Sequence, residues 1–268
     1  MSLISNTFKK SDGKKYDIGI ALSGGGVRGF AHLGVLKALN EKNIDPQIIS
    51  GTSAGAIAGV FYADGYSPDE SFEIFYRNSL FHFTHLSIPN KGLLSIEKIS
   101  KILEKNIKAK TFEDLKKPLY VSATNLNDGK IEYFHQGSII EKVVASASIP
   151  VLFKPQIIDG KTFVDGGVFD NLPIEPIRNQ CKKLIGSYVN PIGKEEDLDS
   201  MIKIAERTFH LSVGSHLQEK KKICDLFIEA EELRKYGMLS LDKGREIFDT
   251  GYKITKEILE KNKPFESQ

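Results

Sequence analysis

The hydrophobic positions of the first third of the chain predict strands and helices in alternation. The apolar and β-branched run YDIGIALS (16–23) predicts a buried strand, and GFAHLGVLKALNEKN (29–43) places apolar residues on one side of a helix. PQIIS (46–50) predicts a second strand, and the small-residue run at 54–65 predicts a helix ended by Gly65. A strand, helix and strand joined by short loops predict a parallel pair, whose loops emerge at one edge of the sheet.

The pattern changes further along the chain. LYVSATNLNDGKIEYF (119–134) predicts two strands joined at Asp128-Gly129, and QIIDGKTFVDGG (156–167) predicts another pair, in which Asp165 ends a strand. An amphipathic helix is expected from about Ser95. Glycine and proline become rare near residue 193, and the Lys/Glu-rich pattern that follows predicts that residues 194–268 are helices packed on the same domain.

Composition narrows the class of protein. The 268 residues are 40% hydrophobic and 27% charged, which fits one soluble α/β domain over 1–268. A net charge of +2, spread along the chain, gives no reason to expect nucleic acid, and the lysines at 220–222 suggest a solvated helix face. No uncharged apolar run reaches the roughly 18 residues of a membrane span, and Cys181 and Cys224 have neither disulfide nor metal spacing. We therefore expect a cytoplasmic protein.

The stretch SGTSAG (50–55) places a serine between two glycines at the end of a predicted strand. One interpretation is a nucleophile elbow, in which a sharp turn lifts the Ser53 hydroxyl above the sheet edge and Gly51 and Gly55 let the chain bend. The other is a tight turn that carries an inert hydroxyl, because this pattern also arises by chance. Catalysis would require an oxyanion hole and a base.

The loop GGGVRG (24–29) lies at the predicted start of a helix, at the same sheet edge. Consecutive glycines there expose backbone N–H groups beside a positive helix end, where an oxyanion would be stabilised. The same residues match a dinucleotide-binding pattern, which also requires an acidic residue about 20 positions on, at the end of the second strand. That strand ends in Ser50-Gly51-Thr52-Ser53, which disfavours a dinucleotide cofactor.

Three further residues have alternative interpretations. Asp165, followed by Gly166 and Gly167, is placed like a catalytic carboxylate of an open α/β sheet, or it caps a turn. Arg28 is either a surface or salt-bridged residue, or it orients the loop or a lipid phosphate. His32, in the first predicted helix, is expected to be a packed or helix-orienting residue rather than a base.

The ordered set GGGVRG, GTSAG, SASIP (146–150) and VDGG (164–167) resembles the patatin-like phospholipase family over about residues 16–190. The resemblance implies a three-layer α/β/α sandwich with a mainly parallel sheet and lipid acyl hydrolase activity through a serine–aspartate dyad. Carried over, Ser53 is the nucleophile and Asp165 the base, and the elbow and dyad are supported by four glycines, Gly51, Gly55, Gly166 and Gly167. The oxyanion hole takes Gly24, Gly25, Gly26, Arg28 and Gly29. Ser23 stands where many members have an aspartate.

The implied substrate is a phospholipid or lysophospholipid ester, with no cofactor and no metal. The alternatives are an acyltransferase or general carboxylesterase on the same fold, and a catalytically silent lipid-binding protein. Contact with a membrane is expected to be peripheral and to use the apolar segment Phe81–Leu86, whose other interpretation is core packing. Neither oligomeric state nor head group follows from the sequence.

A dyad requires that no histidine serve Ser53. His210 and His216 follow Asp165 in the chain, but they lie on a predicted helix, and we expect them to be surface or packing residues. An aspartate has an ordinary pKa near 3.9 and a histidine near 6.5, so activity is expected to persist on the acid side, burial permitting.

Overall fold

The computed structural model describes residues 13–80, 96–194, 198–212, 217–237 and 241–262. The predicted amino-terminal order is confirmed: β1 (Tyr16–Leu22) and β2 (Ile48–Thr52) pair in parallel, and α1 (Phe30–Glu41) connects them. The helix α2 (Ala54–Asp64) follows β2 after a single residue and ends at Gly65, whose φ is 94°. Both loops therefore emerge at the carboxyl ends of neighbouring strands.

The central sheet within the described residues has eight strands in the order β5-β6-β3-β2-β1-β7-β8, with β4 paired to β3 outside this path. The remaining strands are β3 (Leu119–Asn125), β4 (Lys130–Phe134), β5 (Gln156–Ile158), β6 (Lys161–Asp165), β7 (Cys181–Tyr188) and β8 (Leu226–Glu229). Pairing is parallel from β3 through β8 and antiparallel around β4, β5 and β6. Both predicted strand pairs are confirmed.

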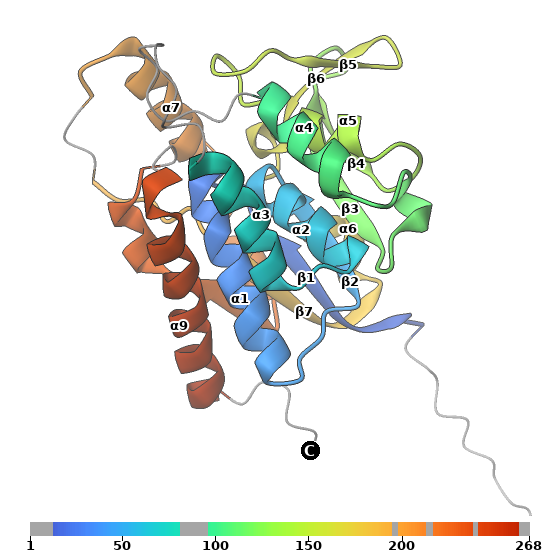
Figure 1. The fold of residues 1–268 in the computed structure, drawn as a ribbon, viewed down its shortest axis with the longest axis vertical. Helices are drawn as coiled ribbons and strands as arrows, with labels where there is room; N and C mark the ends of the chain where they lie inside the picture. Colours follow the sequence, from blue (N-terminus) through green and yellow to red (C-terminus); the bar gives the residue numbers. More distant parts are fainter. Residues whose placement is uncertain (1–12, 81–95, 195–197, 213–216, 238–240, 263–268) are drawn as a thin grey trace, which may run out of the picture.

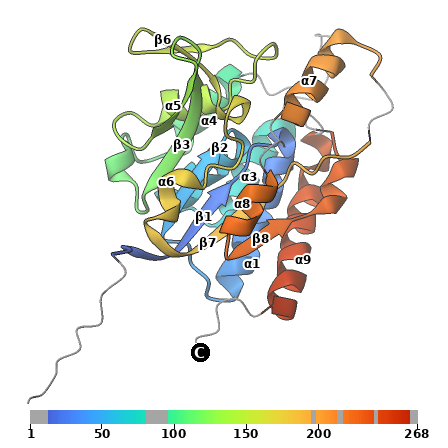
Figure 2. The same cartoon turned by 180° about the vertical axis from the view of Figure 1, so that it is seen from behind.

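Helices cover both faces of the sheet (Figures 1 and 2). On one face lie α1, α2, α3 (Pro68–Leu80), α4 (Ile96–Asn106), α5 (Ile140–Ser146) and α9 (Gly244–Asn262), and on the other lie α6 (Glu175–Arg178) and α8 (Leu217–Ile223). The helix α7 (Met201–Ser212) lies beyond one end of the sheet in both views. The predicted α/β sandwich is confirmed.

Alternate residues of the central strands enter two separate cores. In β1, Ile20 and Leu22 pack in the larger core with α1 and α2, while Ala21 packs in a smaller core on the opposite face. In β2, Ile49 and Ile48 divide in the same way. Successive side chains of a strand point to opposite faces, so this division is the reason that both strands are apolar throughout.

The carboxyl-terminal part is built onto the same sheet. A β-carbon on Gly34 of α1 would lie 2.1 Å from the carbonyl oxygen of Phe248 in α9, so the two helices pack backbone to backbone. The sequence predicted only helices after residue 194, whereas β8 extends the sheet beside β7. The strand β8 has only four residues and directly follows the lysine-rich helix α8, so the sequence pattern of this region predicted a helix.

No helix among the described residues combines the length and hydropathy needed to cross a membrane.

Candidate active site

Ser53 is the single residue between β2 and α2, and its backbone is strained. Its φ of 54° and ψ of −120° lie outside the regions that residues with a side chain usually adopt. The flanking glycines allow this turn because the chain is crowded on both sides. A β-carbon on Gly51 would lie 2.5 Å from the Gly55 carbonyl oxygen, and one on Gly55 would lie 2.2 Å from the Leu22 carbonyl oxygen.

Strand β3 brings Asp165 to this turn. Ser122 of β3 pairs with Thr52 in β2, and the next residue, Ala123, pairs with Asp165 in β6. On its other edge β3 pairs continuously with β4, so β2 and β6 share one edge and their carboxyl ends converge. The residue after Thr52 is Ser53. The register therefore places the serine and the carboxylate, which are distant in the chain, at the same point of the sheet.

Asp165 is a buried carboxylate with one hydrogen-bonded oxygen. Its Oδ1 accepts a 2.7 Å hydrogen bond from the N–H of Gly167, whereas its Oδ2 has no regular hydrogen-bond partner among the described residues. Burial raises the pKa of Asp165 to about 7, and the nearby Ser53 hydroxyl and the Gly167 N–H offset part of that rise. Gly166 packs against Ser122, because a β-carbon there would lie 2.3 Å from Ser122 Oγ.

The prediction that activity persists on the acid side allowed for a shift by burial, and burial does raise the pKa of Asp165 well above its ordinary value. Asp165 is only 1% exposed, and no described cation contributes to its pKa. Desolvation outweighs the two hydrogen bonds that lower the pKa, so the pKa of Asp165 lies in the range of a histidine.

The glycine loop faces the serine, as predicted. A β-carbon on Gly24 would lie 3.3 Å from the Ser53 β-carbon, and one on Gly29 would lie 2.6 Å from the β-carbon of Ala54. The loop continues into a short 3-10 helix, η1 (Gly26–Gly29), ahead of α1. The Gly24 N–H donates to the Asn171 carbonyl at 3.1 Å.

In the described part of the chain, the N–H groups of Gly25 and Gly26 have no hydrogen-bond acceptor. Gly25 has a φ of 166° and a ψ of 14°, and a β-carbon there would lie 2.7 Å from Val189 Cγ2. Gly26 has a φ of 57°, which is a left-handed conformation. Close packing against Val189 therefore favours glycine at position 25, and the left-handed conformation favours glycine at position 26.

Arg28 is buried and anchors the glycine loop to distant segments. Its Nε donates a 2.8 Å hydrogen bond to the Tyr236 carbonyl, and its NH1 donates a 3.0 Å bond to Asn190 Oδ1. The surface interpretation is therefore wrong, and the contacts favour orientation of the loop.

His32 is a packed residue, as expected. Its Nε2 lies 2.8 Å from the Ser23 carbonyl oxygen, which can only accept, so Nε2 carries the proton and Nδ1 accepts from the Ser187 hydroxyl at 2.9 Å. Burial lowers the pKa of His32 to about 4, so the ring is neutral. Ser23, in turn, accepts a 3.0 Å bond on its hydroxyl from the Val189 N–H. These contacts hold the ends of β1 and β7 together.

Sequence reasoning missed the groups that hold the turn in place. The Ser53 N–H donates a 2.8 Å hydrogen bond to Ser146 Oγ, although Ser146 was recognised only as part of SASIP. Thr52 Oγ1 donates to the Asp170 carbonyl at 2.9 Å, so the Ser122 hydroxyl donates to Thr52 Oγ1 at 2.5 Å. Serines and threonines are common at strand and helix ends, so their types alone carried no signal.

Several predictions concern other parts of the chain. Phe81–Leu86 and His216 lie outside the described residues, and His210 lies in α7. Within the described ranges no group of His, Cys, Asp and Glu side chains is arranged to hold a metal ion. Cys181 and Cys224 are free thiols.

Comparison with known proteins shows the family to which this sequence is similar. The sequence model of the patatin-like phospholipase family matches residues 20–178, a range that contains the glycine loop, the Ser53 turn and Asp165. An uncharacterized NTE family protein of Mycobacterium tuberculosis is 33% identical over 217 residues, which are 76% of this chain and 60% of the relative. Lysophospholipase NTE1 of Mycosarcoma maydis is 27% identical, with coverage of 91% of this chain and 15% of the relative. The chain thus spans 60% or less of the length of these relatives.

A solved structure shares the fold. VipD from Legionella pneumophila superposes with a TM-score of 0.55 at 16% identity, over 92% of this chain and 67% of that chain. At this identity the likeness concerns architecture.

Proposed function

The chain belongs to the patatin-like phospholipase family, and on that premise we propose that it hydrolyses lipid esters with Ser53 as nucleophile and Asp165 as general base. The observation that carries this proposal is the pairing register of β3. Thr52 pairs with Ser122 of β3, and Asp165 pairs with the next residue of that strand. The proposal needs no imidazole, and support for this comes from the Ser53 hydroxyl, which lies near enough to Asp165 to lower the pKa of its carboxyl. The oxygen Asp165 Oδ2, which lacks a regular partner among the described residues, is the acceptor for the serine proton.

The reaction proceeds in two steps through an acyl-enzyme. Asp165 takes the proton of Ser53 as Oγ attacks the ester carbonyl, and the same carboxyl then protonates the departing alcohol. Water, deprotonated by Asp165, attacks the acyl-enzyme, and the proton returns to Ser53 as the fatty acid leaves. A pKa of about 7 suits both directions of transfer, since the carboxylate is basic enough to accept the proton and acidic enough to return it.

The developing oxyanion is stabilised by the glycine loop. Of its predicted members, Gly25 and Gly26 have N–H groups without an acceptor in the described chain, so we assign donation to these two. Gly24 keeps the loop open beside Ser53, and Gly29 lets the loop approach α2. Arg28 fixes the orientation of the loop through Tyr236 and Asn190. Preorganised donors of this kind stabilise the transition state more than the substrate.

The proposed substrates are phospholipids or lysophospholipids. Support comes from the family and from relatives named as lysophospholipases. We further propose that residues 1–268 form one patatin-like unit, since α9 packs on α1 and β8 extends the sheet. The last 75 residues then complete the fold instead of forming a separate module.

A serine-reactive fluorophosphonate tests the assignment. The wild-type protein is expected to be labelled and to hydrolyse lysophospholipid and short-chain esters, while Ser53→Ala does neither and stays folded by circular dichroism. Ser148→Ala is the matched control. Ser148 is also buried, but its hydroxyl donates a hydrogen bond to the backbone carbonyl of Val144, four residues earlier. Labelling that persists in Ser53→Ala contradicts the nucleophile, and hydrolysis without labelling contradicts the acyl-enzyme.

A further inference from the structure

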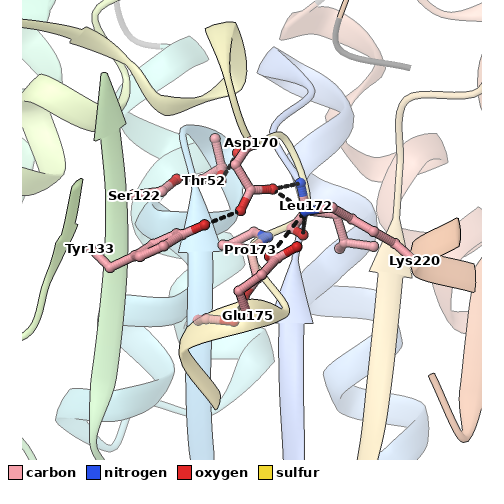
Figure 3. A network of polar contacts seen from close by, with 9 residues as sticks. Thr52, Ser122, Tyr133, Asp170, Leu172, Pro173, Glu175 and Lys220 are labelled. Atoms are coloured by element: carbon pink, nitrogen blue, oxygen red, sulfur yellow. Dashed lines mark hydrogen bonds and ion pairs between the residues drawn. The ribbon is translucent and has the colours of Figure 1, made fainter. Parts of the chain in front are cut away.

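Asp170 is a buried carboxylate that the proposed chemistry does not use. Its Oδ1 accepts hydrogen bonds from Lys220 Nζ at 2.5 Å and from the Leu172 N–H at 3.2 Å, and its Oδ2 accepts from the Tyr133 hydroxyl at 2.6 Å (Figure 3). Burial and the Asp170 charge raise the pKa of Tyr133, so the phenol stays protonated and remains a donor. Both carboxylate oxygens are therefore held in place.

The backbone of Asp170 connects the two halves of the proposed dyad. Its carbonyl oxygen accepts the 2.9 Å bond from Thr52, the residue before Ser53, and its N–H donates at 2.8 Å to the carbonyl of Gly166, the residue after Asp165. Each contact is one residue from a reacting side chain. A movement of Asp170 would therefore disturb the serine turn and the aspartate loop together.

Lys220 comes from α8, on the face of the sheet opposite to α1 (Figure 2). Its ammonium donates to Asp170, to the Leu172 carbonyl at 2.8 Å and to Glu175 Oε2 at 3.1 Å, so all three protons have acceptors in one segment, 170–175. Its side chain is 14% exposed, whereas that of the neighbouring Lys221 is 47% exposed. The prediction of a solvated lysine face is thus wrong for Lys220.

Lys220 offsets a concentration of negative charge. Burial and the charge of Asp170 raise the pKa of Glu175, and the ammonium counteracts that rise. Without the ammonium, two carboxylates would share a half-buried site, which is unfavourable because like charges repel strongly where water is scarce. Either a proton would bind or the segment would move outward.

We propose that Asp170 is a positioning residue which, held by Lys220 and Tyr133, fixes the Asp165 loop against the Ser53 turn and so makes helix α8 part of the catalytic unit. The inference rests on the proposed serine–aspartate function. Its physical basis is the geometric demand of catalysis, since a displacement of about 1 Å can lower a rate by about 10²-fold.

The test compares Lys220→Met with Lys221→Met. Both remove an ammonium from the same helix and break an ion pair, but the partner of Lys221 is Glu229 of β8 and not Asp170. At a temperature well below each melting temperature, Lys220→Met is expected to lower kcat and the rate constant of fluorophosphonate labelling by about 10- to 10²-fold, with KM changed less than about twofold. Lys221→Met is expected to keep both rates, and Lys220→Arg to regain most of them.

A double-mutant cycle separates positioning from general destabilisation. Asp170→Asn is expected to resemble Lys220→Met, and Asp170→Asn/Lys220→Met to be no slower than the worse single variant, because the two groups act as a pair. Rate losses that multiply in the double variant overturn the proposal, as does a folded Lys220→Met with wild-type rates. If Lys220→Met does not fold, Lys220→Gln, which retains donors without the charge, takes its place with the same expectations.

Failure of the proposed function has a different signature. If wild type is not labelled, or if Ser53→Ala is labelled, the dyad itself is wrong. If labelling depends on Ser53 but Lys220→Met reacts at the wild-type rate, only the positioning role is wrong.

Discussion

The backbone N–H of Ser53 donates a 2.8 Å hydrogen bond to the hydroxyl of Ser146, and both residues are buried. The bond crosses from the strained turn to the last residue of α5. A left-handed φ at a residue with a side chain costs on the order of 1–3 kcal/mol, and such strain persists only when neighbours fix the backbone. Ser146 is one of those neighbours.

Ser146→Ala should therefore weaken the turn. It leaves the Ser53 N–H buried without an acceptor, which costs about 1–3 kcal/mol, and we expect a lower free energy of unfolding in urea together with about a 10-fold loss of ester turnover. Ser148→Ala is the control, because Ser148 donates to Val144 and does not touch Ser53. Equal effects of the two substitutions would mean that the Ser146 contact has no special role.

The titration of Asp165 predicts the pH profile of the reaction. The base must be deprotonated, and its pKa is raised to about 7, so kcat/KM should increase with pH through an apparent pKa near 7. A histidine base would give a similar rise of kcat/KM with pH, so substitutions must show which residue is the base. Asp165→Asn is expected to lose about 10²–10⁴-fold in activity while it stays folded, and His210→Ala and His216→Ala each to keep most activity. A folded but inactive histidine variant would falsify the dyad.

The same titration predicts that Asp165 destabilises the folded protein at high pH. Between pH 4 and 7 the folded state retains a proton that the unfolded chain has released, because burial raises the pKa from its ordinary value of 3.8 to about 7. The free energy of unfolding therefore falls as pH rises. At about 1.4 kcal/mol per pKa unit, the total loss due to Asp165 approaches about 4 kcal/mol. Asp165→Asn removes this loss, so its gain in melting temperature over wild type should be larger at pH 8 than at pH 5. A gain that does not change with pH would contradict the assigned titration.

The sequence predicted the elements that local patterns encode. The alternation at residues 16–65 determines the first two strands and their helices, and the glycines around Ser53 indicate the turn. These features depend on nearest neighbours along the chain, so apolar periodicity and glycine placement were sufficient.

Long-range features could not be predicted in the same way. Asp165 was ambiguous from spacing alone, because its role depends on which residue of β3 it pairs with. Its pKa depends on burial at a point where three strands converge, and the burial of Lys220 depends on acceptors 45 and more residues earlier in the chain. The lysine run suggested solvent because each residue was judged by its type, whereas one of the three meets buried acceptors. These features depend on strand register and long-range packing, which local patterns in a single sequence do not reveal.

The last prediction concerns Gly26 of the glycine loop. Its φ of 57° suits glycine, tolerates asparagine better than most residues, and is strongly unfavourable for a β-branched side chain. If the N–H of Gly26 stabilises the oxyanion, turnover should fall in the order wild type, Gly26→Asn, Gly26→Ala, Gly26→Val, because each step makes the native backbone more costly and displaces the donor further. Loss of one such donor lowers turnover by about 10²–10³-fold, and this sets the expected size for valine. The loss should appear in kcat with little change in KM, since the donor acts on the charge that develops in the transition state. Gly25→Ala is the companion variant. Its β-carbon would lie 2.7 Å from Val189 Cγ2, so Val189→Ala should restore part of the activity of Gly25→Ala but none of that of Gly26→Val. A folded Gly26→Val enzyme with near wild-type kcat would remove the loop from the mechanism.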